Sequence, residues 1–395
     1  MSWQPIQSGS LPKICSPFFI ISPVACTERE GTKARKIRIY PTKEQKAIYR
    51  RWLGTSRKVY NNTVNYLNQP KEERETHWMG AAKQLLDELP EWAKEIPYQV
   101  KKMAVKDGFD ALFNGIRKFK KTKESFHLSF RSRKAPKQSC YIPSTAIKEV
   151  GIYVKMAGKL RYSEELPELP KDSRLLWENG RWFITIPYRQ TIAHSDNQGR
   201  VVALDPGIRT FLTGFSPEQT FKIGEGDFSR IARLCVHLDK LISKIAGVKG
   251  DQRRRLKGAA HRLRWKIRDL TDELHFKSVR FLVNSFDLIL LPTFATQQMA
   301  ARVTRKIRAK SVRAMLGFAF FRFGMRLEKA AEAAGKTVLR VNEAYTSKTA
   351  SWTGEIIQVG SAKKITSQGM TVDRDVNGAR GIFLRALVDS PSLAC

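Results

Sequence analysis

The sequence predicts a multidomain α+β protein, and three observations support that prediction. With 395 residues, 42% of them hydrophobic, the chain can build two or three domains that each bury a core. In the first third of the chain, one early strand is followed by segments with helical periodicity. Short segments with strand-like alternation come next. From about residue 196 onward, strands and helices alternate along the chain.

The front of the chain opens on one strand and one long helical pattern. Residues 1–32 show no clear period and are interpreted as an N-terminal extension. ARKIRIYP (34–41) alternates isoleucines with basic residues, which predicts a half-buried strand. From Thr42, an N-cap with Gln45 three residues later, the helical pattern runs to residue 67, and we expect Gly54 to break it.

A helical domain and a strand-rich domain are expected next. Helical patterns cover 78–89 and 98–121, and a Glu-Asn-Gly turn at 178–180 predicts a hairpin. The strands are expected in FHLSFRSRK (126–134), SCYIP (139–143), EVGIYVKMAGKLRYS (149–163) and on both sides of that turn. Because the early strand can pair with these later ones, we expect a β-barrel (33–41 and 124–195) interrupted by helices (42–123). TIAHSDNQGR (191–200) is the linker that follows.

The back half has the order of an RNase H-like domain. VVALD (201–205) is a buried strand, and TFLTGF (210–215) and TFKIG (220–224) extend it as an antiparallel meander. The later elements are a charged helix over 228–285, bent near Gly247–Gly250, strands at 287–292 and 337–342, and helices at 302–334 and 375–388. A meander followed by strand–helix units predicts this fold over 196–345 and 373–390, with an insert at 346–372.

The charge of the chain indicates a polyanionic partner. Lys and Arg number 71 against 37 Asp and Glu, which gives a net charge of +34 and a pI of about 10.2. Such an excess costs self-repulsion in the folded state, and binding to nucleic acid is the usual reason for it.

The remaining composition excludes a membrane or disulfide-based protein. The five cysteines form no CxxC pair, which indicates a reduced, intracellular chain. No apolar run approaches the roughly 20 residues of a membrane helix. The apolar segment 17–26 is short and interrupted by prolines, which argues against a signal peptide.

Three carboxylates stand beside strand or helix ends in this basic chain. Asp205 ends a buried strand in a D-P-G sequence, which is also common in plain turns. Glu343 follows TVLRVN and could equally be a solvated strand-end acid. Asp375 opens the last helix, where Asp is a good N-cap, and we prefer it to the competing Asp373.

Together these acids predict a magnesium site. Two ions about 3.5–4 Å apart need shared carboxylates to clamp a phosphodiester, and Mg²⁺ prefers oxygen ligands. We therefore expect Asp205, Glu343 and Asp375 to be both metal ligands and catalytic residues, with two Mg²⁺ ions as cofactors.

From about residue 34 to 388 the chain resembles the TnpB family, transposon-encoded RNA-guided nucleases with a RuvC domain that are related to Fanzor proteins and type V CRISPR effectors. The segments that carry the resemblance are RIYPTKEQKAIYRRWLGTSRKVYNNTVNYLN (38–68), SFRSRK (129–134), GRWFITIPY (180–188), LDPGIRTF (204–211), YTSKT (345–349) and DRDVNGARGI (373–382). The resemblance implies a guide RNA and target double-stranded DNA with a short flanking motif as partners. It also implies cleavage of that DNA by metal-assisted hydrolysis.

Two departures from the family pattern bear on activity. Pro292 stands where most relatives place the second-motif glutamate, and Glu343 matches a rearranged position just before YTSKT. The two CxxC pairs of the family's zinc finger are replaced by ASWT (350–353) and ITSQ (365–368), so we expect no zinc. That insert must fold by packing or stay mobile.

The resemblance leaves two rival functions open. One is a nuclease-inactive RNA-guided DNA-binding protein, and the other is an unguided RuvC-like nuclease or transposase. We expect the cytoplasm or nucleoid of a prokaryotic host, or a eukaryotic nucleus, and no membrane partner. The sequence does not determine the oligomeric state.

Two basic helical stretches are expected to contact phosphates. The first contains Arg253, Arg254, Arg255, Lys257, Arg262, Arg264, Lys266 and Arg268, and the second Arg302, Arg305, Lys306, Arg308, Lys310 and Arg313. Trp52, Tyr60 and Tyr66 could stack on bases, but their helical spacing favours a place in the core.

Overall fold

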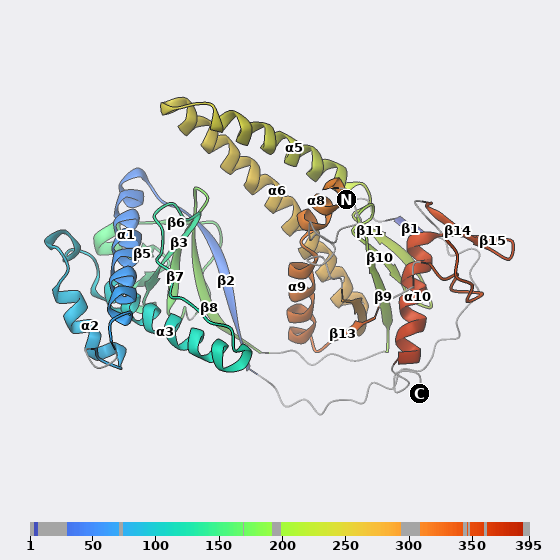
Figure 1. Ribbon diagram of the computed structural model, residues 1–395, viewed down its shortest axis with the longest axis horizontal. Coiled ribbons are helices and arrows are strands. Elements are labelled where there is room, and N and C mark those ends of the chain that lie inside the picture. Colours follow the sequence, from blue (N-terminus) through green and yellow to red (C-terminus); the bar gives the residue numbers. More distant parts are fainter. Residues whose placement is uncertain are drawn as a thin grey trace. The chain divides into compact units, whose positions relative to one another are not determined.

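The computed structural model divides the chain into two units (Figure 1). Unit 2 is Thr32–Gln190, and unit 1 combines Met1–Gly31 with Thr191–Cys395. The structure describes residues 4–6, 30–70, 74–168, 170–191, 199–293, 309–342, 346, 348–358 and 362–389. Each unit has hydrophobic clusters of its own, and the two are described separately below.

The strands of unit 2 form an open sheet. Five strands lie in the order β3-β7-β8-β2-β6. Their bounds are β2 (Glu30–Tyr40), β3 (Lys137–Ile142), β6 (Arg161–Tyr162), β7 (Ser173–Glu178) and β8 (Arg181–Thr191), and β4 (Ile147–Lys148) pairs separately with β5 (Gly151–Ile152). The early strand does pair with the later ones. Among the described residues, however, the end strands β3 and β6 are not neighbours, so the expected closed barrel is not seen.

One segment expected to be a strand in this unit is irregular. FHLSFRSRK (126–134) is coil and turn, although its apolar residues alternate. Its backbone pairs with a helix side chain instead of a strand: Arg131 N–H donates to Asn61 Oδ1 at 2.8 Å, and Asn61 Nδ2 donates to the Arg131 carbonyl at 3.1 Å. The Arg131 guanidinium also binds Asp107 at 3.2 Å. Side-chain partners on helices thus replace the strand that periodicity predicted.

The hairpin between β7 and β8 is confirmed. Asn179 and Gly180 both have positive φ, 45° and 86°, as a two-residue type I′ turn requires. Strand pairing continues up to these two residues, with Glu178 opposite Arg181 and Trp177 opposite Trp182.

Helix α1 (Lys43–Leu67) begins as predicted but is not broken at Gly54. The Thr42 side chain accepts the Gln45 N–H and the Gln45 side chain accepts the Thr42 N–H, a complete capping box. A helical glycine costs about 1 kcal/mol. Tyr49 and Trp52, both nearly fully buried, stabilise the helix by more than that, so it continues.

Other helices of unit 2 pack on α1 at two clusters. The helix α2 (Trp78–Asp87), the 3₁₀ turn Glu91–Ala93 and the helix α3 (Tyr98–Thr122) share a cluster with Val59, Tyr66 and Leu67 of α1, whereas the short α4 (Val154–Ala157) joins the cluster of Tyr49 and Trp52. Trp52, Tyr60 and Tyr66 are all buried, which confirms their place in the core.

Unit 1 is built on a six-stranded mixed sheet in the order β1-β11-β10-β9-β12-β13. Strands β9 (Val201–Pro206), β10 (Leu212–Phe215) and β11 (Thr220–Ile223) form the predicted antiparallel meander, and β12 (Leu288–Pro292) and β13 (Thr337–Val341) run parallel to β9. The sixth strand, β1 (Gln4–Ile6), pairs with β11 and comes from residues interpreted as an extension. Three residues carry too little pattern to predict a strand.

Helices cover both faces of this sheet. On one face Val202, Leu204, Ile289 and Leu291 pack with α6 (Gly250–Ser285) and α9 (Phe320–Ala333). On the other face Val201, Ala203, Leu288 and Leu290 pack with α10 (Arg374–Asp389). A continuous apolar run such as VVAL is needed because each strand is buried on both sides.

The charged helical stretch is a helical hairpin. It consists of α5 (Asp227–Ala246) and α6 (Gly250–Ser285), separated at Gly247–Lys249 where a bend was expected. Figure 1 shows the two helices running side by side away from the sheet.

The expected helix at 302–334 is two helices in its described part. Residues 302–308 lie outside the described ranges, and α8 (Ala309–Phe318) is separated from α9 (Phe320–Ala333) by Ala319 at φ 50°. Residues two apart in one helix face different sides. The break lets both Phe318 and Phe320 pack on Phe211, with ring centroids 5.2 and 5.3 Å away.

The insert that lacks cysteines has a small core of its own. It contains the hairpin of β14 (Lys364–Ser367) and β15 (Met370–Asp373) and a bridge between Thr349 and Ile356. Ala350, Ile365, Val372 and Val376 are buried together, with Trp352, Ile357 and Met370 packed against them. The described part of the insert therefore folds by packing.

Candidate active site

Asp205 lies near the carboxyl end of β9, on the sheet face that α10 covers. Val201 and Ala203 face α10, and the alternation of the strand places Asp205 on the same side. Its neighbour on the adjacent strand β10 is the buried Thr213.

Asp375 lies in the first turn of α10, and the helix is capped by its neighbour Asp373. The Asp373 Oδ1 atom accepts the N–H groups of Asp375 at 2.9 Å and of Val376 at 3.3 Å. Capping, the alternative role considered for Asp375, therefore belongs to Asp373. The Asp375 side chain does not serve as the cap.

The carboxylate of Asp205 approaches α10 one turn after Asp375. A Cβ atom added to Gly378 would lie 2.6 Å from Asp205 Oδ2, so the carboxylate rests where that side chain would be. Residues three apart in a helix share a face. The structure thus brings the Asp205 carboxylate to the helix face that carries Asp375.

The electrostatics around Asp375 are those of a crowded acidic site. Burial raises the pKa of its carboxyl, and the neighbouring Asp373 raises it further, while Lys222, Arg209 and Arg374 lower it. A pocket of about 540 Å³ opens here. It is lined by Ile208, Arg209, Thr210, Lys222, Glu225, Gly226, Ser229, Lys363, Asp373 and Asp375. Mixed acids and cations around a half-buried carboxyl suit a phosphate ester with a divalent cation.

The third predicted acid, Glu343, lies outside the described residues. The strand before it is described: Val341 pairs in register with Pro292, and Thr293 N–H donates to the Val341 carbonyl at 3.2 Å. Within the described ranges no three His, Cys, Asp or Glu side chains lie close enough to hold a metal ion. The structure therefore brings together two of the three predicted acids.

Two motif residues of α10 fasten the insert beside the site. The buried Asn377 donates from Nδ2 to the Thr349 carbonyl at 2.8 Å and accepts the Ser351 N–H at 2.9 Å. Arg380 donates to the Ser351 carbonyl at 2.6 Å and to its hydroxyl at 3.0 Å. The same helix therefore holds Asp375 and anchors the residues just after YTSKT.

The positions where the family places zinc thiolates do not fit that ion. Ala350 and Ile365 belong to the apolar core of the insert. The Thr353 hydroxyl instead bonds that of Ser367 at 2.9 Å, and Ser367 donates to Glu355 Oε2 at 2.7 Å. Methyl groups and neutral hydroxyls are not the thiolate or imidazole ligands that structural zinc needs.

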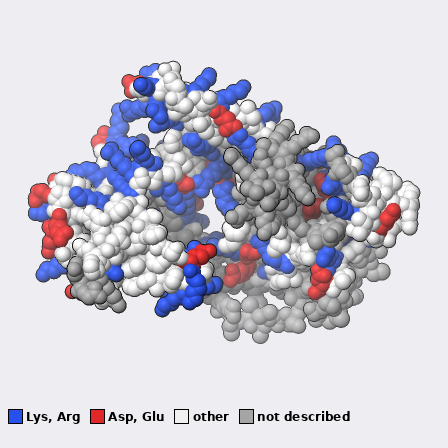
Figure 2. Space-filling model, viewed as in Figure 1, with Lys and Arg blue, Asp and Glu red and all other residues white. Residues whose placement is uncertain are grey.

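The basic helix α6 presents its charges to solvent. Its side chains at 253, 254, 255, 257, 262, 264 and 266 are exposed. On the face of the α5–α6 hairpin seen in Figure 2, Lys and Arg are more frequent than Asp and Glu. Arg268 is half-buried and lies over the Trp265 ring.

The second basic stretch falls mostly outside the described residues, which exclude 302–308. Its member Arg313 is engaged within the fold: it donates to Asp239 Oδ1 at 2.8 Å and to the Cys235 carbonyl at 3.2 Å. That contact joins α8 to α5; the phosphate contact expected of Arg313 stays a prediction.

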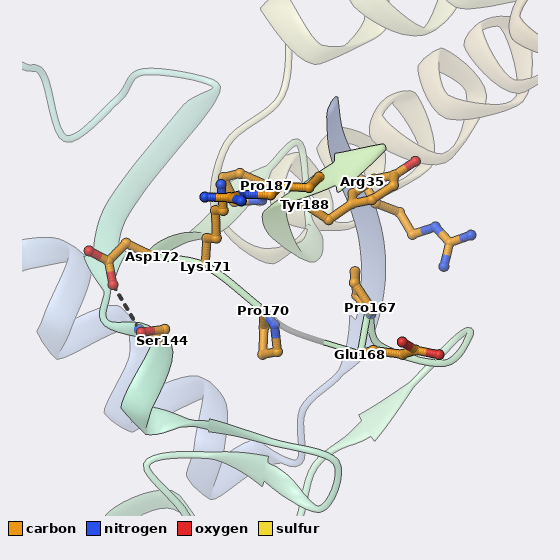
Figure 3. A pocket seen from close by; sticks show the side chains of 10 residues that line it. Arg35, Ser144, Pro167, Glu168, Pro170, Lys171, Asp172, Pro187 and Tyr188 are labelled. Atoms are coloured by element: carbon orange, nitrogen blue, oxygen red, sulfur yellow. Dashed lines mark hydrogen bonds between the residues drawn. The ribbon is translucent and has the colours of Figure 1, made fainter. Parts of the chain in front are cut away.

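Unit 2 has a separate hollow of about 960 Å³ (Figure 3). Arg35, Lys171 and Arg189 line it together with three prolines. Its two acids lie on opposite sides, and Asp172 accepts the Ser144 N–H at 3.0 Å. Its two carboxylates therefore do not converge as the ligands of a two-metal site would.

Sequence reasoning missed Lys222 and Gly378. Lys222 on β11 has its Nζ atom 2.8 Å from Asp373 Oδ2. A single lysine within TFKIG was the available signal, since the strand is otherwise apolar or neutral. Nothing in the sequence alone marks Gly378 as the contact of Asp205.

Fold and site together define a mixed α+β, multidomain protein with two carboxylates at the edge of the sheet of unit 1. Residues 320–382 match the Cas12f1-like TNB domain, and residues 31–76 match the helix-turn-helix domain of IS605 OrfB proteins. In the structure the described part of 31–76 is mainly strand β2 and the single helix α1.

Curated relatives and a solved structure extend these matches over most of the chain. It is 25% identical to the putative transposase A625R of Paramecium bursaria Chlorella virus 1, over 90% of this chain and 87% of that protein. It is 24% identical to the TnpB-like protein L79 of Acanthamoeba polyphaga mimivirus, over 89% and 72%. A putative RNA-guided DNA endonuclease of Streptomyces pristinaespiralis is also 24% identical, over 91% and 90%.

The fold is similar to that of Cas12f1 in its complex with sgRNA and target DNA. The TM-score is 0.50 at 12% identity, over 89% of this chain and 98% of that one. The chain is therefore similar to TnpB-like proteins and transposases, the resemblance that its motifs indicated. No helix within the described ranges is long and apolar enough to cross a membrane.

Proposed function

We propose that the chain is an RNA-guided DNA endonuclease of the TnpB type, with Asp205, Glu343 and Asp375 holding two Mg²⁺ ions. The observation that carries the proposal is the approach of the Asp205 carboxylate to the first turns of α10, where Asp375 lies. Bound Mg²⁺ would supply Lewis acidity toward the phosphodiester and an activated water. The oxygen ligands match the preference of that ion.

The position of Glu343 in the sequence supports its place in the site. Val341 is on the α10 face of β13, and Glu343 follows two residues later. The side chain of Pro292, in register with Val341, has no ligand atom to offer, so the acid that follows the neighbouring strand takes the role.

The fold also prepares the site for a phosphate. The amino end of α10, with its positive dipole end, lies at Asp375; its first N–H groups are already bonded to Asp373 and to the Lys363 carbonyl, so the dipole and not free donors would attract the phosphate. Arg209 and Lys363 line the same pocket and would attract the DNA backbone. The chain's own groups thus bind and orient the strand that is cut.

Guide RNA and target DNA are proposed as the partners. The solvent-facing cations of α6 and the net charge of +34 support a long polyanion. We assign the flanking motif and the heteroduplex to the helical domain (42–123) and the strand-rich domain (33–41 and 124–195). We assign cleavage to the nuclease domain (196–345 and 373–390), which carries the insert (346–372).

Copurified RNA and a target library test this function. RNA bound to the purified protein should be sequenced, and a plasmid library carrying the matched target and randomised flanks should then be cut. Absence of a bound RNA species would indicate an unguided nuclease. Bound RNA with target binding but no cleavage would indicate the inactive binder.

Single variants test the site itself. Asp205→Ala, Glu343→Ala and Asp375→Ala should each abolish cleavage while leaving DNA binding nearly intact. Asp389→Ala, an exposed carboxylate at the far end of α10, is the matched control and should cut like the wild type. Full cutting by Glu343→Ala would contradict the rearranged site. If only Pro292→Glu conferred cutting, the wild-type chain would be a binder.

A further inference from the structure

One buried cation links the sheet to the helix that carries Asp375. Lys222 on β11 binds Asp373 Oδ2 at 2.8 Å, and its side chain is only 15% exposed. Phe221 and Ile223 on either side of it face the opposite core, so Lys222 faces α10. The ion pair therefore joins the third strand of the meander to the start of the last helix.

Lys222 also lies in one row with Asp205. Across the sheet, Lys222 is opposite Thr213 on β10, and Thr213 is opposite Asp205 on β9. The row spans three strands and faces α10 throughout. The contact of Lys222 with Asp373, at one end of this row, therefore fixes the start of α10 relative to β9, the strand that carries Asp205.

The two oxygens of Asp373 have different tasks. Oδ1 caps the N–H groups of Asp375 and Val376, while Oδ2 binds Lys222. Because the cap and the ion pair share one carboxylate, movement of the lysine is transmitted to the backbone of Asp375 itself. An exposed pair of this kind would contribute little. Here the lysine is 15% and the aspartate 37% exposed, and the same carboxylate caps a helix start, so the pair fixes an orientation and not only a charge.

We propose that Lys222 is a positioning residue: through Asp373 it sets the first turn of α10, and so the place of the Asp375 carboxylate as a metal ligand. This inference rests on the proposed metal-dependent nuclease function. Groups that orient metal ligands from behind typically change metal affinity 10- to 100-fold or so when removed.

The sign of a metal-affinity change separates positioning from simple electrostatics. Removing a positive charge beside carboxylates should, by Coulomb's law alone, tighten the binding of a divalent cation. Loss of positioning should weaken it. Mn²⁺ binding to the purified protein without target DNA, followed by the electron paramagnetic resonance of free Mn²⁺, measures this directly.

Lys222→Met should bind Mn²⁺ about tenfold more weakly than the wild type. Lys222→Arg keeps the charge and a donor, so it should restore most of that loss. Lys363→Met removes another cation of the same pocket that is exposed, and it should bind Mn²⁺ as tightly as the wild type or tighter. Asp373→Asn should reproduce the loss, and the double variant with Lys222→Met should add little to it.

The outcomes distinguish the inference from the function on which it rests. Unchanged or tighter Mn²⁺ binding by Lys222→Met, with normal binding by the wild type, overturns the positioning role alone. A wild-type protein that binds no Mn²⁺, or binds it equally well as Asp205→Ala, overturns the metal site itself. Faster amide exchange at Asp375 and Val376 in Lys222→Met would support the proposed route.

Discussion

Protonation of His275 should destabilise the hydrophobic core around Phe211 in unit 1. His275 is fully buried on α6 and stacks on Phe211, with ring centroids 5.4 Å apart at an interplanar angle of 18°. Its Nε2 atom lies 2.7 Å from the Phe318 carbonyl, and Nδ1 lies 3.1 Å from Arg326 Nη1. The neutral ring with a proton on Nε2 satisfies both contacts, because Nδ1 then accepts from the guanidinium. A second proton would have to face Arg326.

The structure sets the size of this effect. Burial lowers the pKa of His275 from 6.5 to about 4, and Arg326 and Arg322 lower it as well, against the Phe318 carbonyl. Because the folded pKa is below the unfolded one, the stability is fully present above pH 6.5 and is lost as the pH falls toward 4. At about 1.4 kcal/mol per pH unit the full difference is about 3 kcal/mol, of which about 2 kcal/mol should be lost between pH 7 and 4.5.

Urea unfolding of the wild type and of His275→Gln between pH 7 and 4.5 is the appropriate assay. Glutamine can donate to the Phe318 carbonyl and accept from Arg326, but it does not titrate. Other groups titrate equally in both proteins, so the difference between their unfolding free energies isolates the histidine. If the two curves run parallel across this range, the neutral buried imidazole is refuted.

Three further predictions follow from single contacts. Asp287→Ala should lower the unfolding free energy by about 3 kcal/mol in urea titrations, because it leaves the buried ammonium group of Lys336 unpaired. The emission of Trp352 should be unaffected by a zinc chelator, whereas Ile365→Ala should expose that indole and cost about 2–4 kcal/mol. Gly378→Val should stop cleavage but not DNA binding, because a side chain there displaces the Asp205 carboxylate; cutting at the wild-type rate would contradict it.

Periodicity predicted the elements of unit 1 well because its strands are buried on both faces. VVALD and DLILLP are continuous apolar runs, and they became the parallel neighbours β9 and β12. The exceptions have local causes. Strand β1 is too short to show a period, and Ala319 breaks a helix so that two phenylalanines can share one partner.

Unit 2 was predicted less well because tertiary contacts override its local pattern. The strand expected at 126–134 is held instead by Asn61 and Asp107, residues of helices far away in the sequence. Gly54 does not end its helix, because burial of the surrounding aromatics outweighs its conformational cost. Neither outcome can be read from a short window of sequence.

For the site, sequence could select the acids but not their partners. Asp375 was preferred to Asp373 because it opens the helix, and the structure gives the cap to Asp373. Lys222 lies 151 residues from Asp373 along the chain, so no spacing rule connects them. The role of Glu343 as the third metal ligand beside Asp205 and Asp375 stays a prediction.

The two ends of the same parallel strands show why acids beside strand patterns are ambiguous in sequence. Asp287, just before β12, is 2% exposed and accepts from the Arg200 backbone at 3.0 Å and its Nε at 3.1 Å, and from Lys336. Burial opposes its ionisation, but these partners outweigh burial and lower its pKa to about 2.

Asp375, at the carboxyl edge of the same sheet, shows the opposite shift. Burial and Asp373 raise its pKa, and the nearby cations only partly offset them. An acid whose partners lower its pKa is ionised at neutral pH and stabilises the fold through those partners. A carboxyl whose surroundings raise its pKa is costly to ionise, so a bound divalent cation would stabilise its ionised form the most. That difference in sign separates the structural acid at one end of the sheet from the proposed ligand at the other.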